Sequence, residues 1–153
     1  MRRFTPLIIA LLALIVTSCS IPNSVEQFLR SSQVDQDGDY VYELDMNDTT
    51  CNWSLAIFSK IDGDFGEEFG DVILDAQFAS PTGKLYADTL YVSASQFYQA
   101  GAYSKEFMVD YRNNFKPVEN GPWTLRLHIK QAPEGICGLG IKLSRHCPSA
   151  ISK

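Results

Sequence analysis

Cysteines are the residues of this chain whose chemistry is easiest to define. Three of them, Cys51, Cys137 and Cys147, lie beyond the N-terminal apolar segment. In an exported protein two of the three could form a disulfide and leave one thiol, and the spacing leaves all three pairings open. Cys51 and Cys137 each stand in phase with apolar neighbours, so buried free thiols are the alternative. Because no CxxC or HExxH spacing occurs, we expect no zinc site.

The fourth cysteine, Cys19, ends an N-terminal segment with the composition of a secretion signal. Met1 to Arg3 supplies positive charge, and Leu7 to Val16 is an almost unbroken apolar run followed by small residues. A transmembrane helix would need about 20 apolar residues, which this run does not reach. The pattern therefore predicts a cleaved signal over residues 1–18.

The four residues Val16-Thr17-Ser18-Cys19 look like a bacterial lipobox, in which an aliphatic and two small residues precede the cysteine that is acylated. The motif predicts that Cys19 carries acyl chains such as palmitate and becomes the first residue of the mature protein. Two acyl chains are enough for stable membrane anchoring, whereas one gives marginal binding. The alternative is ordinary cleavage, which would release a soluble secreted protein.

Residues suited to acid–base or nucleophilic catalysis are present but form no motif. The two histidines, His128 and His146, lie in unrelated contexts, and no GxSxG, SxxK or phosphate-binding glycine loop occurs. His128 stands between Arg126 and Lys130 on the expected solvent face of a strand, where a solvated imidazole is the simpler interpretation. We therefore expect a protein that is not an enzyme.

The acidic segment from Asp62 to Asp71 is the strongest candidate for a metal site. It offers five carboxylates, the ligands that Ca²⁺ takes, and a solvated acidic surface is the favoured alternative. These carboxylates belong to Asp62, Asp64, Glu67, Glu68 and Asp71. The earlier run from Asp35 to Asp39 fails the EF-hand pattern, because Tyr40 occupies the position that requires glycine. We expect no resident cofactor.

Length and charge limit the remaining function classes. The chain has 153 residues, with 13 basic against 18 acidic side chains and a net charge of −5. Removal of the signal takes away Arg2 and Arg3 and makes the mature protein more acidic. Such a surface does not favour nucleic acid or anionic lipid, so membrane contact is expected through the lipid alone. The mature length suits one domain.

Alternation of apolar and polar residues predicts an all-β fold, an antiparallel β-sandwich of jelly-roll or Ig-like type with about seven to eight strands. Seven segments show it: Tyr40 to Met46, Cys51 to Ile57, Val72 to Phe78, Leu85 to Val92, Tyr103 to Tyr111, Pro122 to Lys130, and Ile136 to Leu143. The predicted sandwich occupies residues 38–147. Residues 19–37 form a lipidated N-terminus and flexible tether, in which Val25 to Arg30 could make a helical turn, and 148–153 form a tail.

The last two segments are predicted to form a β-hairpin around the turn Ala132-Pro133-Glu134-Gly135. Trp123, Leu125, Leu127 and Ile129 would face the core. Arg126, His128 and Lys130 would then form a basic stripe on the solvent face of an acidic protein. This stripe is a candidate docking surface for a protein partner.

The lipobox together with the strand pattern resembles the gliding-motility lipoprotein H family of the Bacteroidota. The similarity covers roughly Tyr40 to Arg145. It is carried by the block from Phe69 to Val92, with Phe78, Pro81-Thr82-Gly83-Lys84 and Asp88-Thr89-Leu90 in order, and by the ending Gly121 to Gln131, Glu134 to Ile136 and Gly138 to Leu143. The chain departs from the family in its short Ala132 to Gly135 connection and in Cys51, Cys137 and Cys147, which are not part of that pattern.

Membership of that family would imply an envelope lipoprotein that is anchored in the outer membrane and associated with the gliding and secretion machinery. It implies protein partners in the envelope and no catalytic residue, and relatives also occur in non-gliding bacteria. The alternative is a surface lipoprotein that binds glycans. In that case exposed tyrosines would stack on sugars, and the candidates are Tyr86, Tyr91, Tyr98 and Tyr103.

Overall fold

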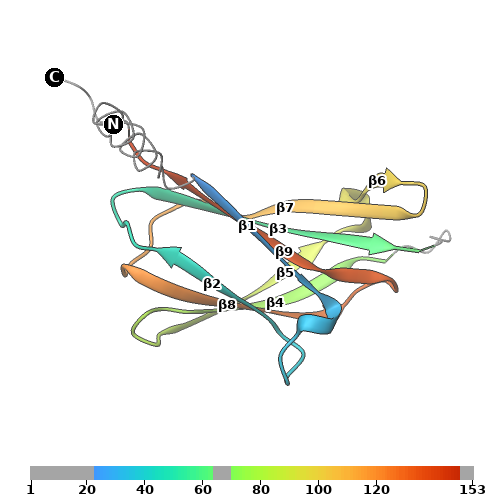
Figure 1. Ribbon diagram of the computed structural model, residues 1–153, viewed down its shortest axis with the longest axis horizontal. Coiled ribbons are helices and arrows are strands. Elements are labelled where there is room, and N and C mark those ends of the chain that lie inside the picture. Colours follow the sequence, from blue (N-terminus) through green and yellow to red (C-terminus); the bar gives the residue numbers. More distant parts are fainter. Residues whose placement is uncertain (1–22, 64–69, 149–153) are drawn as a thin grey trace, which may run out of the picture.

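The computed structural model describes residues 23–63 and 70–148 of the chain, which form two antiparallel sheets packed face to face (Figure 1). The all-β sandwich predicted from the alternation is therefore confirmed. The first sheet has the order β1-β9-β3-β7-β6 and the second has the order β2-β8-β4-β5. Within the described residues, no helix is long and apolar enough to cross a membrane.

Nine strands and two short 3-10 helices make up these layers. Their bounds are β1 Ser24–Arg30, η1 Ser31–Gln33, β2 Tyr40–Met46, β3 Asn52–Asp62, β4 Val72–Ala79, β5 Leu85–Val92, η2 Ala94–Gln96, β6 Tyr98–Gly101, β7 Ser104–Phe115, β8 Gly121–Gln131 and β9 Ile136–His146. The seven predicted strands correspond to β2 to β5 and β7 to β9. The strands β1 and β6 were not predicted.

The core lies between the sheets and is built from alternate strand residues, as the pattern predicted. Leu125 and Leu127 of β8 are fully buried, and they face a layer that includes Leu139 and Ile141 of β9. A polar contact also crosses this core, because the hydroxyl of Tyr42 donates to the carbonyl of Leu139 at 2.7 Å. Burial raises the pKa of Tyr42 well above its usual value, so the hydroxyl keeps its proton and remains a donor.

The prediction of a hairpin between β8 and β9 is wrong. The strand β8 pairs with β2 and β4 in one sheet, whereas β9 pairs with β1 and β3 in the other. The turn from Ala132 to Gly135 therefore carries the chain from one layer to the other. Alternation identifies which side chains face the core, but two strands that face each other across a core show the same alternation as two that pair in one sheet.

The predicted flexible tether also differs from the structure. Ser24–Arg30 form β1, which pairs with β9 from Ser24 opposite Ser144 to Arg30 opposite Gly138. The apolar residues Val25, Phe28 and Leu29 have the spacing of a helical turn, which is why the sequence alone favours such a turn here. Pairing with the edge of β9 overrides this local preference, because it satisfies backbone groups along the whole segment.

Two glycines of β9 make room for this pairing. Gly138 has φ +155°, and a Cβ there would lie 2.1 Å from the carbonyl oxygen of Leu29 in β1. Gly140 lies between Phe28 of β1 and Phe58 of β3 in the strand register. These two rings stack with centroids 6.0 Å apart, over the position where Gly140 has no side chain. The glycines thus let the first strand approach the sheet closely.

Candidate functional site

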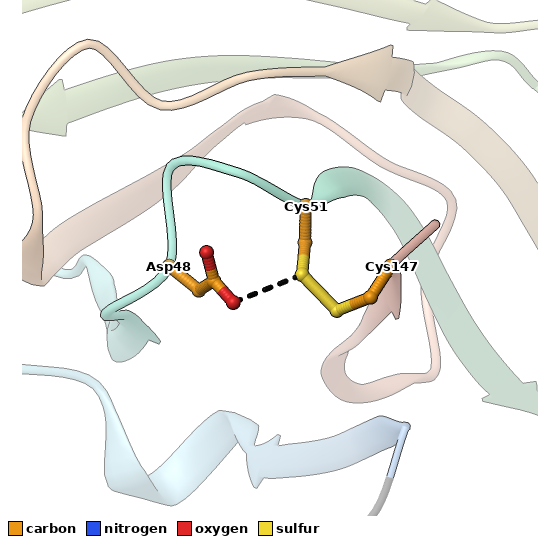
Figure 2. A group of neighbouring side chains, drawn as sticks. All are labelled: Asp48, Cys51 and Cys147. Carbon is orange, nitrogen blue, oxygen red and sulfur yellow. Dashed lines mark hydrogen bonds between the residues drawn. A yellow bond between two sulfur atoms is a disulfide. The ribbon is translucent and has the colours of Figure 1, made fainter. Parts of the chain in front are cut away.

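A disulfide joins Cys51 and Cys147 at one end of the sandwich (Figure 2). The register of β3 and β9 explains the pairing, because Asn52 lies opposite His146 and the next residues outward are the two cysteines. Cys51 is 1% exposed and Cys147 is exposed. Of the three pairings left open by the spacing, the structure contains this one, and Cys137 is the free thiol.

Asp48 completes a group of three potential metal ligands with these cysteines, whose ligand atoms lie within 4.8 Å of one another. Asp48 Oδ2 lies 3.0 Å from Cys51 Sγ, the contact drawn as a dashed line in Figure 2. A disulfide sulfur has no proton to donate and is not a thiolate, so the oxidised pair offers no metal site. Asp48 instead accepts hydrogen bonds from Thr50, chiefly from its side chain, and these lower the pKa of Asp48.

The free thiol of Cys137 lies at the opposite end of β9 and is partly buried. Desolvation raises its pKa, and the nearby carboxylate of Asp62 adds to this effect. A reactive cysteine needs a depressed pKa in positively charged surroundings. Cys137 therefore has the setting of an unreactive thiol.

The basic stripe Arg126, His128 and Lys130 lies on the outer face of β8, as predicted, but its charges are paired within the chain. Arg126 Nη1 donates to Asp35 Oδ2 at 2.6 Å and to Asp39 Oδ2 at 3.3 Å. His128 Nδ1 lies 2.8 Å from Asp39 Oδ1. Lys130 Nζ contacts Asp75 Oδ2 at 3.1 Å.

The three basic residues, with Asp39 and Asp75, line an open hollow of about 550 Å³ over the sheet β2-β8-β4-β5. The acidic partners of Arg126 come from the run Asp35 to Asp39, which fails the EF-hand pattern. There, Asp35 Oδ1 accepts from the backbone amides of Asp37 and Asp39, so the aspartate closes a turn. Because the two signs of charge alternate in this hollow, it is a poorer docking surface for an acidic partner than an unpaired basic stripe would be.

The acid sensitivity of this ion-pair network can be predicted. The backbone amide of Asp39 and then the guanidinium of Arg126 hold the pKa of Asp35 below its usual 3.8. Stability from this carboxylate is thus present above about pH 3.8 and lost as the pH falls through the lower folded pKa. The urea concentration at the midpoint of unfolding should fall between about pH 5 and about pH 2, and we expect this fall to be smaller in the Asp35→Asn protein. Identical pH profiles for the two proteins would contradict this role of Asp35.

Other predicted site residues are engaged elsewhere or dispersed. In the acidic segment, Asp62 pairs with Lys60 at 3.2 Å and Asp71 accepts from the amide of Ala94 at 2.7 Å. Asp64, Glu67 and Glu68 lie outside the described residues, as does Cys19. The four tyrosines are exposed, but Tyr86 and Tyr91 are an odd number of residues apart on β5 and so project from opposite faces. They do not form one stacking platform.

In residues 23–63 and 70–148, no hydrogen bond joins either histidine to a serine hydroxyl or to a thiol. The hydrogen bond of His128 to Asp39 therefore has no nucleophile on its other side. Comparisons with protein-family models and with curated proteins found no match to this chain.

Proposed function

We propose that this protein is a lipid-anchored component of the bacterial cell envelope, with Cys19 as the acylated residue. The sequence Val16-Thr17-Ser18-Cys19 after the apolar run from Leu7 carries the proposal. The β-sandwich would act as a non-catalytic structural or accessory domain that contacts other envelope proteins. The resemblance to the gliding-motility lipoprotein H family supports an association with gliding or secretion machinery at the outer membrane.

The Cys51–Cys147 disulfide supports an extracytoplasmic location. Disulfides persist in oxidising compartments such as the periplasm or the cell surface and are rare in the reducing cytosol. The bond lies at the end of the β3–β9 ladder, where it holds the C-terminal strand against its neighbour. In a domain exposed to proteases and detergents at the cell surface, this covalent link would increase the resistance to unfolding.

The start of β1 also limits how far the domain could stand from a membrane. Ser24 is the fifth residue after Cys19, and a fully extended chain spans at most about 3.6 Å per residue, or about 18 Å here. The proposed anchor would therefore hold the end of the sandwich with Ser24, Ser144 and the disulfide close to the lipid surface. The opposite end, with the η1 turn, would point away from it.

Replacing Cys19 by alanine tests the anchor. We expect Cys19→Ala to leave the domain folded and to move most of the protein from the membrane fraction to the soluble fraction, because the acceptor sulfur is absent. Immunoblots of fractionated cells measure this distribution. Cys137→Ala is the matched control, since it removes a cysteine that bears no disulfide, and it should stay in the membrane. Membrane retention of Cys19→Ala would contradict the proposal.

A further inference from the structure

An aromatic groove lies at the side of the sandwich where β5 and the loop between β7 and β8 meet. It has a volume of about 280 Å³ and is open to solvent. Its apolar wall includes Phe78, Tyr86, Phe115, Val118 and Trp123. The set draws on both sheets, because Phe115 ends β7 while the residues from β4, β5 and β8 belong to the other layer. The groove thus enters the space between the layers.

The wall presents apolar surface to water. Val118 is 71% exposed and Tyr86 is 45% exposed, so both side chains present apolar surface to water in the same groove. The rings of Tyr86 and Trp123 lie with centroids 6.0 Å apart. Trp123 is only 6% exposed, and its indole nitrogen donates to the carbonyl of Glu119, so this ring is a mostly covered part of the lining whose polar edge is satisfied.

The charges that line the groove are basic, although the protein is acidic overall. Arg112 and Lys116 line it, and its lining within the described residues includes no carboxylate. Arg112 Nη2 is held at 2.7 Å by Asp88 Oδ2, so its charge is largely neutralised. Lys116 is exposed and makes no ion pair within the described part of the chain. The groove therefore combines an apolar wall with one uncompensated positive charge.

We propose that the aromatic groove binds an anionic amphiphile, a free acyl chain that ends in a carboxylate. Apolar groups would pack against the exposed surfaces of Tyr86 and Val118, next to the Trp123 ring, and the carboxylate would lie at Lys116. The hydroxyl of Tyr86, which has no hydrogen-bond partner among the described residues, is a second donor at the same rim. A sugar would need several polar groups around it, which this wall does not supply. The proposal does not depend on the lipid anchor.

Quenching of Trp123 fluorescence by ω-bromodecanoate tests the proposal in the full chain. Bromine quenches tryptophan only at short range, so binding to distant apolar parts of the chain gives no signal at Trp123. The chain has two tryptophans, and Trp53→Phe leaves Trp123 as the single reporter. We expect saturable quenching below the micellar concentration, and none with ω-bromodecyltrimethylammonium, whose charge is opposite. In the Trp123→Phe protein, the fluorescence of the remaining Trp53 should be unaffected.

Three variants in the Trp53→Phe background assign the site. Tyr86→Ala should weaken binding about ten-fold through lost apolar contact, and Lys116→Glu about five-fold through charge reversal. Tyr91→Ala is the matched control, since it removes an exposed tyrosine from the opposite face of the same strand, and it should change nothing. Unfolding midpoints confirm that each variant is folded.

Equal quenching by the cationic amphiphile, equal weakening by Tyr91→Ala, or absence of quenching by ω-bromodecanoate would each overturn the proposal. A further outcome would assign the groove to another occupant. In that case ω-bromodecanoate would not quench, and sedimentation would show self-association that increases with protein concentration and is abolished by Val118→Asp. This result would show that a second copy of the chain occupies the groove.

Discussion

Replacing Cys51 and Cys147 together by alanine should lower the free energy of unfolding by about 2–5 kcal/mol. The bond closes a loop with a sequence separation of 96, so it removes many conformations from the unfolded chain. If the stabilisation comes from the reduced conformational entropy of the unfolded chain, a loop of this size gives about 4.7 kcal/mol. Burial of Cys51 adds to the effect, because alanine leaves part of its volume empty. Urea unfolding of the oxidised protein and the double variant measures the difference.

Cys137→Ala is the control for this experiment, because it removes a partly buried sulfur that closes no loop. Its effect should stay near about 1 kcal/mol. Adding a reductant to the natural protein should reproduce most of the loss seen in the double variant and should leave that variant unchanged. A double variant as stable as the Cys137→Ala protein would show that the bond does not form.

The second large effect is expected at Gly138. Its φ of +155° and the carbonyl oxygen of Leu29, 2.1 Å from where a Cβ would be, leave no space for a side chain. Gly138→Val should therefore destabilise the domain by at least about 2 kcal/mol, through backbone strain and through displacement of β1. Hydrogen exchange should show the displacement as faster exchange of the β1 amides that pair with β9.

Gly70→Ala is the matched control, because a Cβ at that glycine meets nothing within 4 Å. Its stability should be within about 0.5 kcal/mol of the natural protein. If Gly138→Val left exchange in β1 unchanged, the segment from Ser24 to Arg30 would behave as the tether that its composition suggested, and the pairing of β1 with β9 would be wrong.

The strands β8 and β1 differ in how well the sequence alone predicts their structure. Strict alternation from Trp123 to Lys130 identified a strand, its buried face and its basic solvent face, because burial acts on side chains one residue at a time. The same alternation did not show that β8 and β9 belong to different sheets. In β1, three apolar residues at helical spacing favour a helical turn, and only pairing with the edge of β9 makes the segment a strand.

For the site residues as well, the sequence predicts which side chains are exposed but not which distant residues they contact. The stripe Arg126, His128 and Lys130 was predicted, yet its neutralisation by Asp35, Asp39 and Asp75 required contacts with residues distant in the sequence. The pairing of Cys51 with Cys147 also required the register of β3 and β9. The aromatic groove is not predictable from the sequence for the same reason, since its wall is assembled from β4, β5, β7 and β8, and only Tyr86 of these residues is a sequence candidate for binding.

The mass of the N-terminal peptide tests the proposed function most directly. Protein extracted from the envelope and digested should yield a first peptide that begins at Cys19 and carries the added mass of a diacylglyceryl group. The same peptide should be absent from the Cys19→Ala protein. A first peptide that begins at Cys19 or a later residue without added lipid, or one that retains Leu7 to Val16, would contradict the account of this protein as a lipoprotein.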